Sequence, residues 1–210
     1  MKVKTCGLFR QEDIVFANVL QPDFVGFVFA PSRRQIDIAM AQKLKEALLD
    51  SIQAVGVFVN APKEEIAQIA RLKVIDMIQL HGDESEEYIS ELKVLCDLPI
   101  IKAVCVRSAR DLGVVNGADY MLYDALNAGS GMRFDWGLLE GFCAKKPYFL
   151  AGGINAQNLA QAMRLDSYAI DVSSGIESHG FKDFEKMAHI IRTVRAFPSV
   201  DENLSNEEKR

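Results

Sequence analysis

Short runs rich in β-branched and aromatic residues alternate along the chain with longer stretches of helical periodicity, and this alternation constrains the fold more than any other feature. The candidate strands are residues 3–6, 24–29, 54–58, 77–80, 100–104, 120–122, 148–150 and 168–171. Such alternation is typical of a parallel sheet wrapped by helices. We therefore expect an α/β fold built from eight βα units.

Apolar residues recur at helical spacing between these runs. The clearest sets are Ile38, Ala41, Leu44 and Leu48; Tyr88, Leu92 and Leu95; and Phe184, Met187, Ala188, Ile191 and Val194. Asn155 is a candidate N-cap for a helix that reaches about Leu165, and Asp135 can open another. Residues 108–115 predict only a short helix.

Eight units in 210 residues favour a closed (βα)8 TIM barrel over an open, flavodoxin-like sheet, because closure leaves no exposed parallel edge. No low-complexity linker interrupts residues 1–197, so we expect a single catalytic domain there. Residues 198–210 are polar and charged, which is typical of a flexible tail.

Charge and cysteine content narrow the function classes. The formal net charge of −5 gives no general electrostatic reason to expect nucleic acid or an anionic membrane as partner. The four cysteines lack the spacing of a zinc site, so we expect reduced thiols and no metal, with Cys96 and Cys143 as packing residues on helices. The chain shows no apolar signal segment or membrane-spanning run. We expect a soluble, cytoplasmic protein whose partner is a small molecule.

Two glycine-bearing segments follow the seventh and eighth predicted strands, at the end of the barrel where active sites lie. Glycine lets the backbone approach an anion, and successive amides at a helix start can donate to its oxygens. The residues are Gly152, Gly153, Ser173, Ser174 and Gly175. We interpret them as a phosphate site, although either segment alone could simply turn the chain.

Other polar side chains fall at the same rim. Cys6 ends the first strand and is a candidate base or nucleophile, although burial as a packing residue is the commoner fate of cysteine, and Cys105 competes with it. Asp124 follows the sixth strand as a functional carboxyl or a loop cap. Arg34 offers a bidentate fork for a carboxylate, although a solvated surface arginine is the commoner reading of such a residue. His81 is an acid or base, or by default a residue that orders its loop.

Several segments, taken in order, carry a resemblance to a known family. They are KTCGL at 4–8, FVGFVF at 24–29 with SRR at 32–34, QLHGDE at 79–84, Asp124 with GSG at 129–131 and FDW at 134–136, LAGGI at 150–154, and DVSSGIE at 171–177. Over residues 2–195 the chain resembles the phosphoribosylanthranilate isomerases. Thr5 and Phe9 depart from the family pattern, and we expect Phe9 to alter loop one.

The resemblance implies an Amadori rearrangement of N-(5-phosphoribosyl)anthranilate in tryptophan biosynthesis, without metal or coenzyme. It implies that Cys6 is the general base and Asp124 the general acid. Arg34 would hold the anthranilate carboxylate, and Gln79 and Asp171 would face the same pocket. Backbone amides of the glycine-bearing segments would bind the phosphate, and the loop after strand six would be shaped by Gly129, Ser130 and Gly131.

Three alternatives remain at this point. A ribulose-phosphate epimerase would need metal-binding histidines, and an indole-glycerol-phosphate-forming synthase would need a lysine as general acid. Neither is evident at the carboxyl ends of the predicted strands. A non-catalytic sensor of a phosphometabolite needs neither Cys6 nor Asp124. Either a monomer or a homodimer is compatible with the sequence.

Overall fold

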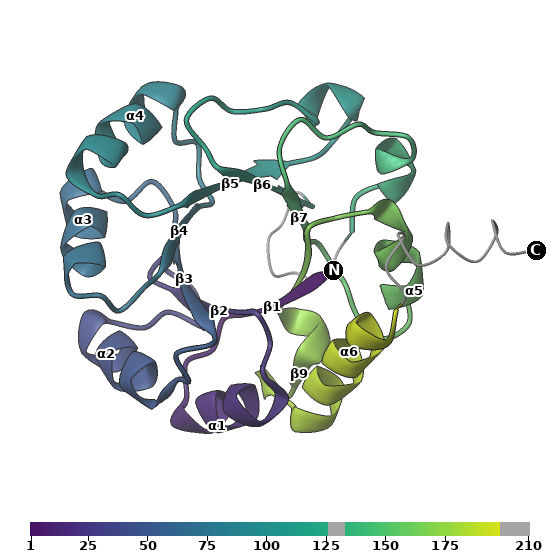
Figure 1. Ribbon diagram of the computed structural model, residues 1–210, viewed down its shortest axis with the longest axis horizontal. Coiled ribbons are helices and arrows are strands. Elements are labelled where there is room, and N and C mark those ends of the chain that lie inside the picture. Colours follow the sequence, from purple (N-terminus) through teal and green to yellow (C-terminus); the bar gives the residue numbers. More distant parts are fainter. Residues whose placement is uncertain (126–132, 198–210) are drawn as a thin grey trace, which may run out of the picture.

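Eight parallel strands close into a barrel in chain order, with β1 hydrogen-bonded to both β2 and β8 (Figure 1). The structure, a computed structural model, describes residues 1–125 and 133–197. The strands are β1 Lys2–Cys6, β2 Phe24–Val28, β3 Gln53–Phe58, β4 Met77–Leu80, β5 Ile100–Cys105, β6 Tyr120–Asp124, β7 Tyr148–Leu150 and β8 Ala169–Val172. The predicted (βα)8 barrel is confirmed.

Two strand ends differ from the sequence prediction in a way that matters for the site. β6 extends to Asp124, because its ladder with β5 pairs Asp124 with Cys105 and the Val106 amide donates to the Asp124 carbonyl. Asp124 is therefore the last residue of a strand rather than a loop residue. β8 begins and ends one residue later than predicted, so that Asp171 lies within it.

Full helices cover the outside of the barrel beside most strands (Figure 1). They are α1 Gln11–Leu20, α2 Ile38–Ala47, α3 Lys63–Arg71, α4 Glu86–Leu95 and α6 Phe184–Ala196. The side chains of Asp37, Ser85 and Asp183 cap α2, α4 and α6 by accepting from backbone amides of the first turn. The three helices predicted from apolar spacing are thus confirmed.

Between β5 and β8 the outer layer is made of short elements instead. They are the 3-10 helices η1 Ala109–Asp111, η2 Trp136–Leu139 and η3 Met163–Leu165, with the four-residue helix α5 Leu159–Ala162. Asp135 caps η2 as predicted, by accepting from Gly137. The predicted helix start at Asn155 is too early, because its side chain accepts from the Gln157 amide in a turn and α5 begins at Leu159. The predicted end near Leu165 is confirmed by η3.

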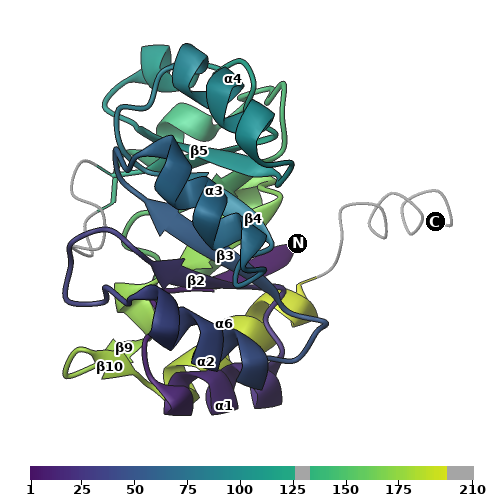
Figure 2. The same cartoon turned by 90° about the vertical axis from the view of Figure 1, so that its left-hand side faces the viewer.

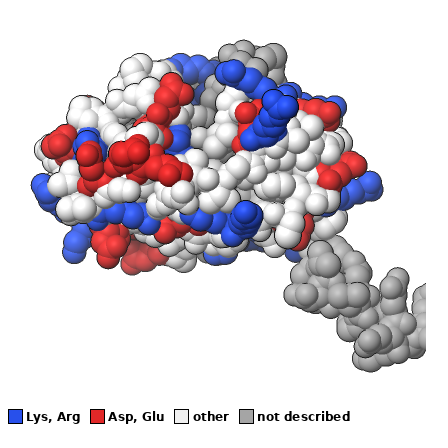
Figure 3. All heavy atoms as spheres, turned by 90° about the horizontal axis from the view of Figure 1, so that it is seen from above, with Lys and Arg blue, Asp and Glu red and all other residues white. Residues whose placement is uncertain are grey.

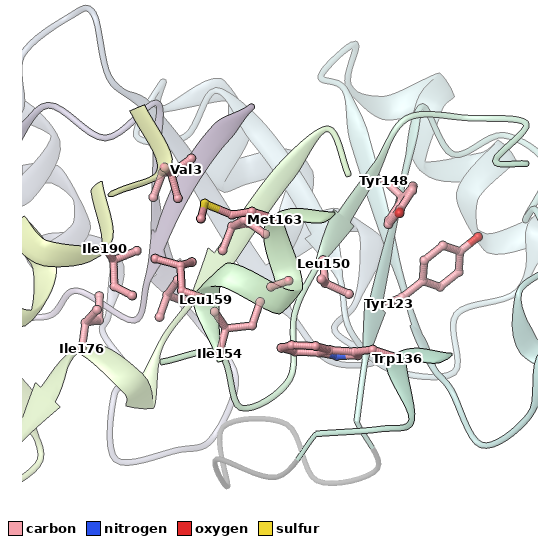
Figure 4. Close-up of a cluster of buried hydrophobic side chains, with 14 of the residues drawn as sticks. Val3, Tyr123, Trp136, Tyr148, Leu150, Ile154, Leu159, Met163, Ile176 and Ile190 are labelled. Carbon is pink, nitrogen blue, oxygen red and sulfur yellow. The ribbon is translucent and has the colours of Figure 1, made fainter. Parts of the chain in front are cut away.

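Apolar side chains pack on both faces of the sheet, inside the barrel and between the barrel and the outer elements. Inside the barrel, large side chains such as Phe24 and Phe149 meet edge to face with ring centroids 5.4 Å apart. Outside it, Figure 4 shows Trp136 and Leu159 of the short elements among side chains of β1, β6 and β7. The apolar filling leaves the polar side chains to gather at the rim.

A small antiparallel hairpin stands at one end of the barrel. Its strands are β9 Glu177–Ser178 and β10 Phe181–Lys182, and Figure 2 shows it on the side of the molecule away from the amino terminus. The ring of Phe9 lies 6.0 Å from that of Phe181, and the Arg10 guanidinium lies 4.7 Å above the same ring. Phe9 thus packs loop one against the hairpin.

Acidic and basic side chains are interspersed over the face seen in Figure 3. Among the helices that the structure describes, none is both long enough and apolar enough to cross a membrane. The predicted tail at 198–210 and the loop residues Gly129, Ser130 and Gly131 lie outside the described residues.

Candidate active site

A cavity with about 220 Å³ of water-accessible volume opens at the carboxyl ends of the strands. Most of the residues predicted from the sequence line it, although they come from five different strands and the loops after them. They are Cys6, Gln79, Asp124, Gly152, Gly153, Asp171, Ser173 and Ser174, joined by His81. Two groups distant along the chain, a thiol and a carboxyl, therefore share one cavity.

Cys6 is the last residue of β1 and is buried. On the neighbouring strand a Cβ at Gly26 would lie 2.6 Å from the Cys6 sulfur, so only glycine leaves room for the thiol. The Ser173 hydroxyl donates to the Cys6 carbonyl at 3.0 Å. Burial raises the pKa of the Cys6 thiol above its ordinary value, and the nearby ammonium of Lys4 acts in the opposite direction.

Two neighbours contact the Asp124 carboxylate, and a third side chain contacts one of them. Its Oδ1 accepts from the Ala125 amide at 2.7 Å, and its Oδ2 lies 3.3 Å from Nε2 of His81. Nδ1 of the same imidazole lies 2.7 Å from Nε2 of Gln79, which is buried. Gln79 thus contacts His81, and His81 contacts the Asp124 carboxylate. His81 therefore reaches beyond its own loop.

The loops after β7 and β8 approach each other closely. Gly152 and Gly153 have φ of 88° and 63°, a region that favours glycine, and a Cβ at Gly152 would lie 3.0 Å from Oδ1 of Asp124. A Cβ at Gly175 would lie 1.9 Å from the Ile154 carbonyl oxygen. Gly175 is set behind the cavity wall, in the 3-10 helix η4 Ser174–Ile176. The first amides of such a turn have no acceptor within it, so they can bind an anion.

Arg34 pairs with a carboxylate of the protein itself. Its Nε and Nη2 donate to the two oxygens of Glu177 at 2.7 and 3.1 Å, and Arg34 is 8% exposed without lining the cavity. Lys182 donates to the same carboxylate at 2.8 Å, and Arg33 pairs with it from the surface. Burial alone would raise the pKa of Glu177, but Arg34 and Lys182 outweigh it and lower that pKa.

Sequence reasoning missed the lysines around Cys6. The Lys4 ammonium is fully buried and donates to Oδ2 of Asp171 at 2.9 Å, while Lys182 also donates to the Ser173 carbonyl at 3.0 Å. β1 reads Lys-Val-Lys-Thr-Cys, so the signal that could have found Lys4 is its place two residues before Cys6, on the same face of the strand.

The other cysteines lie apart from this arrangement. Cys105 is half-buried and lines a second cavity, of about 580 Å³, on the far side of Asp124. Cys96 follows α4 and is half-buried, whereas Cys143 is exposed in a loop, so its prediction as a packing residue on a helix is wrong. Within residues 1–125 and 133–197, no group of three or more histidine, cysteine or acidic side chains is placed to hold a metal ion.

Comparison with known proteins identifies the relatives of this chain. A family model described as N-(5'phosphoribosyl)anthranilate (PRA) isomerase matches residues 3–193. The isomerase of Endomicrobium trichonymphae is 43% identical over 200 residues, which cover 93% of this chain and 98% of that protein. The solved phosphoribosyl anthranilate isomerase of Thermus thermophilus superposes with a TM-score of 0.84 at 32% identity, covering 93% and 99% of the two chains.

A second solved isomerase carries a ligand, reduced 1-(o-carboxyphenylamino)-1-deoxyribulose 5-phosphate. It superposes with a TM-score of 0.82 at 32% identity and covers 94% of this chain and all of its own. The matched family model spans nearly all of the described barrel, from the second residue of β1 to within α6. The chain belongs to the N-(5'-phosphoribosyl)anthranilate isomerase family.

Proposed function

We propose that the chain isomerises N-(5'-phosphoribosyl)anthranilate to 1-(2-carboxyphenylamino)-1-deoxyribulose 5-phosphate, a step of tryptophan biosynthesis, with Cys6 as general base and Asp124 as general acid. The observation that carries the proposal is that this thiol and this carboxyl line the same cavity at the carboxyl end of the barrel. Membership of the isomerase family, and the analogue bound to a solved relative, support the substrate.

The acid acts first. Asp124 donates a proton to the ring oxygen of the ribose, the bond from that oxygen to the anomeric carbon breaks, and the lone pair of the anthranilate nitrogen forms an iminium. This step needs a carboxyl whose other contacts leave an oxygen free to face the sugar. Oδ1 of Asp124 is occupied by the Ala125 amide, so Oδ2, beside His81, is the oxygen we assign to the transfer.

The base acts second. The iminium acidifies the adjacent sugar carbon, and the Cys6 thiolate removes its proton while the electron pair moves toward nitrogen, giving an enol. Protonation of the anomeric carbon and loss of the enol proton give the ketone, so atoms and electrons balance as an isomerisation requires. The nitrogen of the substrate is the electron sink throughout.

Substrate binding uses both ends of the molecule. Backbone amides around Gly152, Gly153 and Ser174 would bind the phosphate at the loops after β7 and β8. Glu177 occupies the Nε and Nη2 edge of Arg34, which leaves Nη1 to donate to the anthranilate carboxylate. Glu177 would therefore hold the plane of the guanidinium while a second carboxylate binds at its end.

The test is substitution of each reacting group. Cys6→Ala and Asp124→Ala should each abolish turnover in a fluorescence assay of substrate consumption, while the circular dichroism spectrum and binding of the reduced product analogue persist. Cys143→Ala, which removes an exposed thiol, is the matched control and should keep full activity. Substantial turnover by either site variant would refute the assigned roles. Binding without consumption by the unaltered protein would favour a sensor.

A second test concerns the anthranilate end. Arg34→Ala should chiefly raise KM, because the carboxylate of the substrate loses its charged donor. Unchanged steady-state constants would remove Arg34 from the site.

We also propose a cytoplasmic location, as suits a biosynthetic step. For assembly, monomers have been generated from the dimeric isomerase of Thermotoga maritima, so both expected states occur among the relatives.

A further inference from the structure

Lys4 and Cys6 lie two residues apart on β1, so their side chains fall on the same face of the strand. Asp171 is directly opposite Lys4 in the register between β1 and β8. The Lys4 ammonium is fully buried and meets Oδ2 of Asp171 at 2.9 Å. A buried cation is thus placed beside the thiol, and its counter-ion Asp171 lines the same cavity as Cys6.

The donors of this ammonium point to a second partner. An ammonium has three N–H donors, and a buried one normally uses them. Among the described residues, the one oxygen recorded as accepting from Lys4 belongs to Asp171. Cys6 is the neighbour of Lys4 on the same face of β1, and its ionised sulfur would attract the ammonium electrostatically.

Other charged groups also stand around Cys6, and each of them has a partner of its own. On β10, Lys182 is tied to Glu177, which also holds Arg34 beyond β2. On β2 itself, the uncharged Gly26 faces the sulfur. Across the cavity lie His81 and Asp124, which contact each other. Of the groups that act on the thiol, Lys4 opposes the effect of burial most strongly, ahead of Lys182, and Asp171 adds to the effect of burial.

We propose that Lys4 is a positioning residue that favours ionisation of the Cys6 thiol against the effect of burial, with Asp171 anchoring the ammonium. The proposal rests on the assignment of Cys6 as general base, for which the thiolate is the competent form. Lys4 does not line the cavity and so acts through Cys6 rather than on the substrate. Asp171 would both anchor the ammonium and contact the substrate. It lines the cavity, and its Oδ1 is buried without a hydrogen-bond partner among the described residues.

The direct test is the reactivity of Cys6 as a function of pH, without substrate. Alkylation by iodoacetamide, followed at the Cys6 peptide by mass spectrometry, separates this thiol from the other three cysteines. In Lys4→Met the rate at neutral pH should fall about tenfold, because an adjacent positive charge that favours thiolate is lost. The midpoint of the pH profile should move upward. An unchanged profile would overturn the proposal.

Lys102→Met is the matched control. Lys102 is also a nearly buried lysine of a barrel strand, and it is also paired with one carboxylate, Glu84, at 3.0 Å. It does not line the cavity that holds Cys6, but the second one. The alkylation profile of Cys6 should therefore stay within about twofold of the unaltered protein, whatever stability is lost. An equal fall in both variants would show that any loss of a buried ion pair loosens the thiol, and would contradict a specific role for Lys4.

A second measurement leaves Lys4 in place and decides the matter if Lys4→Met does not fold. Coupling between two titrating groups is reciprocal, so ionisation of Cys6 must be felt at the ammonium. The NMR resonance of the Lys4 Nζ should shift at the pH where alkylation of Cys6 sets in, and this shift should be absent in Cys6→Ala. If the chemical shift of Lys4 Nζ does not change as Cys6 ionises, the proposal is overturned.

The pH dependence of catalysis separates failure of this proposal from failure of the proposed function. If both hold, the acidic limb of kcat in Lys4→Met moves to higher pH together with the alkylation profile, whereas a merely structural effect lowers kcat without moving that limb. If Cys6→Ala keeps its turnover, the base assignment fails, and the alkylation and NMR results still stand or fall for Lys4.

Discussion

The two sides of the cavity are built from different chemistry. Around Cys6 lie buried ammonium groups, each tied to a carboxylate: Lys4 with Asp171 and Lys182 with Glu177. Around Asp124 lie an imidazole and a backbone amide, and within residues 1–125 and 133–197 no lysine or arginine pairs with this carboxyl. Fixed positive charge favours an anion such as a thiolate, whereas a proton donor is better served by hydrogen bonds alone.

The largest expected effect isolates the Asp124 side. Asp124→Asn keeps the shape and can still accept from the Ala125 amide, but it has no acidic proton for the ring oxygen. We expect kcat to fall on the order of 10³-fold with little change in KM, measured by the fluorescence assay. The alkylation profile of Cys6 should be unchanged, because the two sides are independent. A large shift in that profile would break the distinction between them.

Glu177→Gln removes a carboxylate from the side of the cavity around Cys6. Glu177 is the common carboxylate of Arg33, Arg34 and Lys182, and its side chain is 4% exposed. Its removal leaves two nearly buried cations uncompensated, so we expect the free energy of unfolding at neutral pH to fall by about 3 kcal/mol in chemical denaturation. A loss below about 1 kcal/mol would mean that the cluster contributes little.

The same variant has a pH signature. The pKa of Glu177 is lowered in the folded protein, so its stabilising contribution is complete above the ordinary glutamate pKa and is lost as pH falls through the lower folded value. The difference in unfolding free energy between the unaltered protein and Glu177→Gln should shrink steadily below a pH of about 4.5. A difference that grows toward acid would contradict the direction of this pKa shift.

Gly175→Ala tests the loops that join the two sides. The added carbon would lie 1.9 Å from the Ile154 carbonyl oxygen, an overlap that only a backbone shift can relieve. We expect KM to rise about tenfold because the amides that would bind the phosphate move. Gly113→Ala, where no atom lies within 4 Å of the added carbon, is the control and should leave KM unchanged. Equal constants for both variants would remove the loop after β8 from phosphate binding.

The smallest effect is expected at the surface of the charged side. Arg33 pairs with Glu177, but its side chain is 54% exposed. Arg33→Ala should lower the free energy of unfolding by less than about 1 kcal/mol, because an exposed ion pair is screened by water. A loss as large as that of Glu177→Gln would show that exposure does not distinguish the members of this cluster.

The sequence predicted the fold better than it predicted the charges of the site. Strand runs and strongly periodic helices such as α2 and α6 were readable because each is a local pattern. The short elements between β5 and β8 were predicted only in part: Asp135 caps η2 as expected, but a turn at residues 156–158 separates Asn155 from α5. Tertiary packing, rather than local preference, decides such segments.

The candidate site divides in the same way. Cys6 and Asp124 were found because they stand at strand ends, where a barrel places its chemistry. Lys4 and Lys182 were not, because each depends on a carboxylate contact that appears only when strands or loops are brought together: β1 meets β8 across the whole chain. The link from Gln79 through His81 to Asp124 likewise joins β4 to β6 across the barrel mouth.

A crystal structure of this protein with the reduced product analogue would test the central claim most directly. We expect the second sugar carbon to lie roughly 3.5 Å from the Cys6 sulfur, with the Asp124 carboxyl on the opposite side of the sugar and the phosphate on the amides around Gly153 and Ser174. A complex in which the sugar contacts only one of the two groups, or in which the phosphate binds elsewhere, would contradict the account.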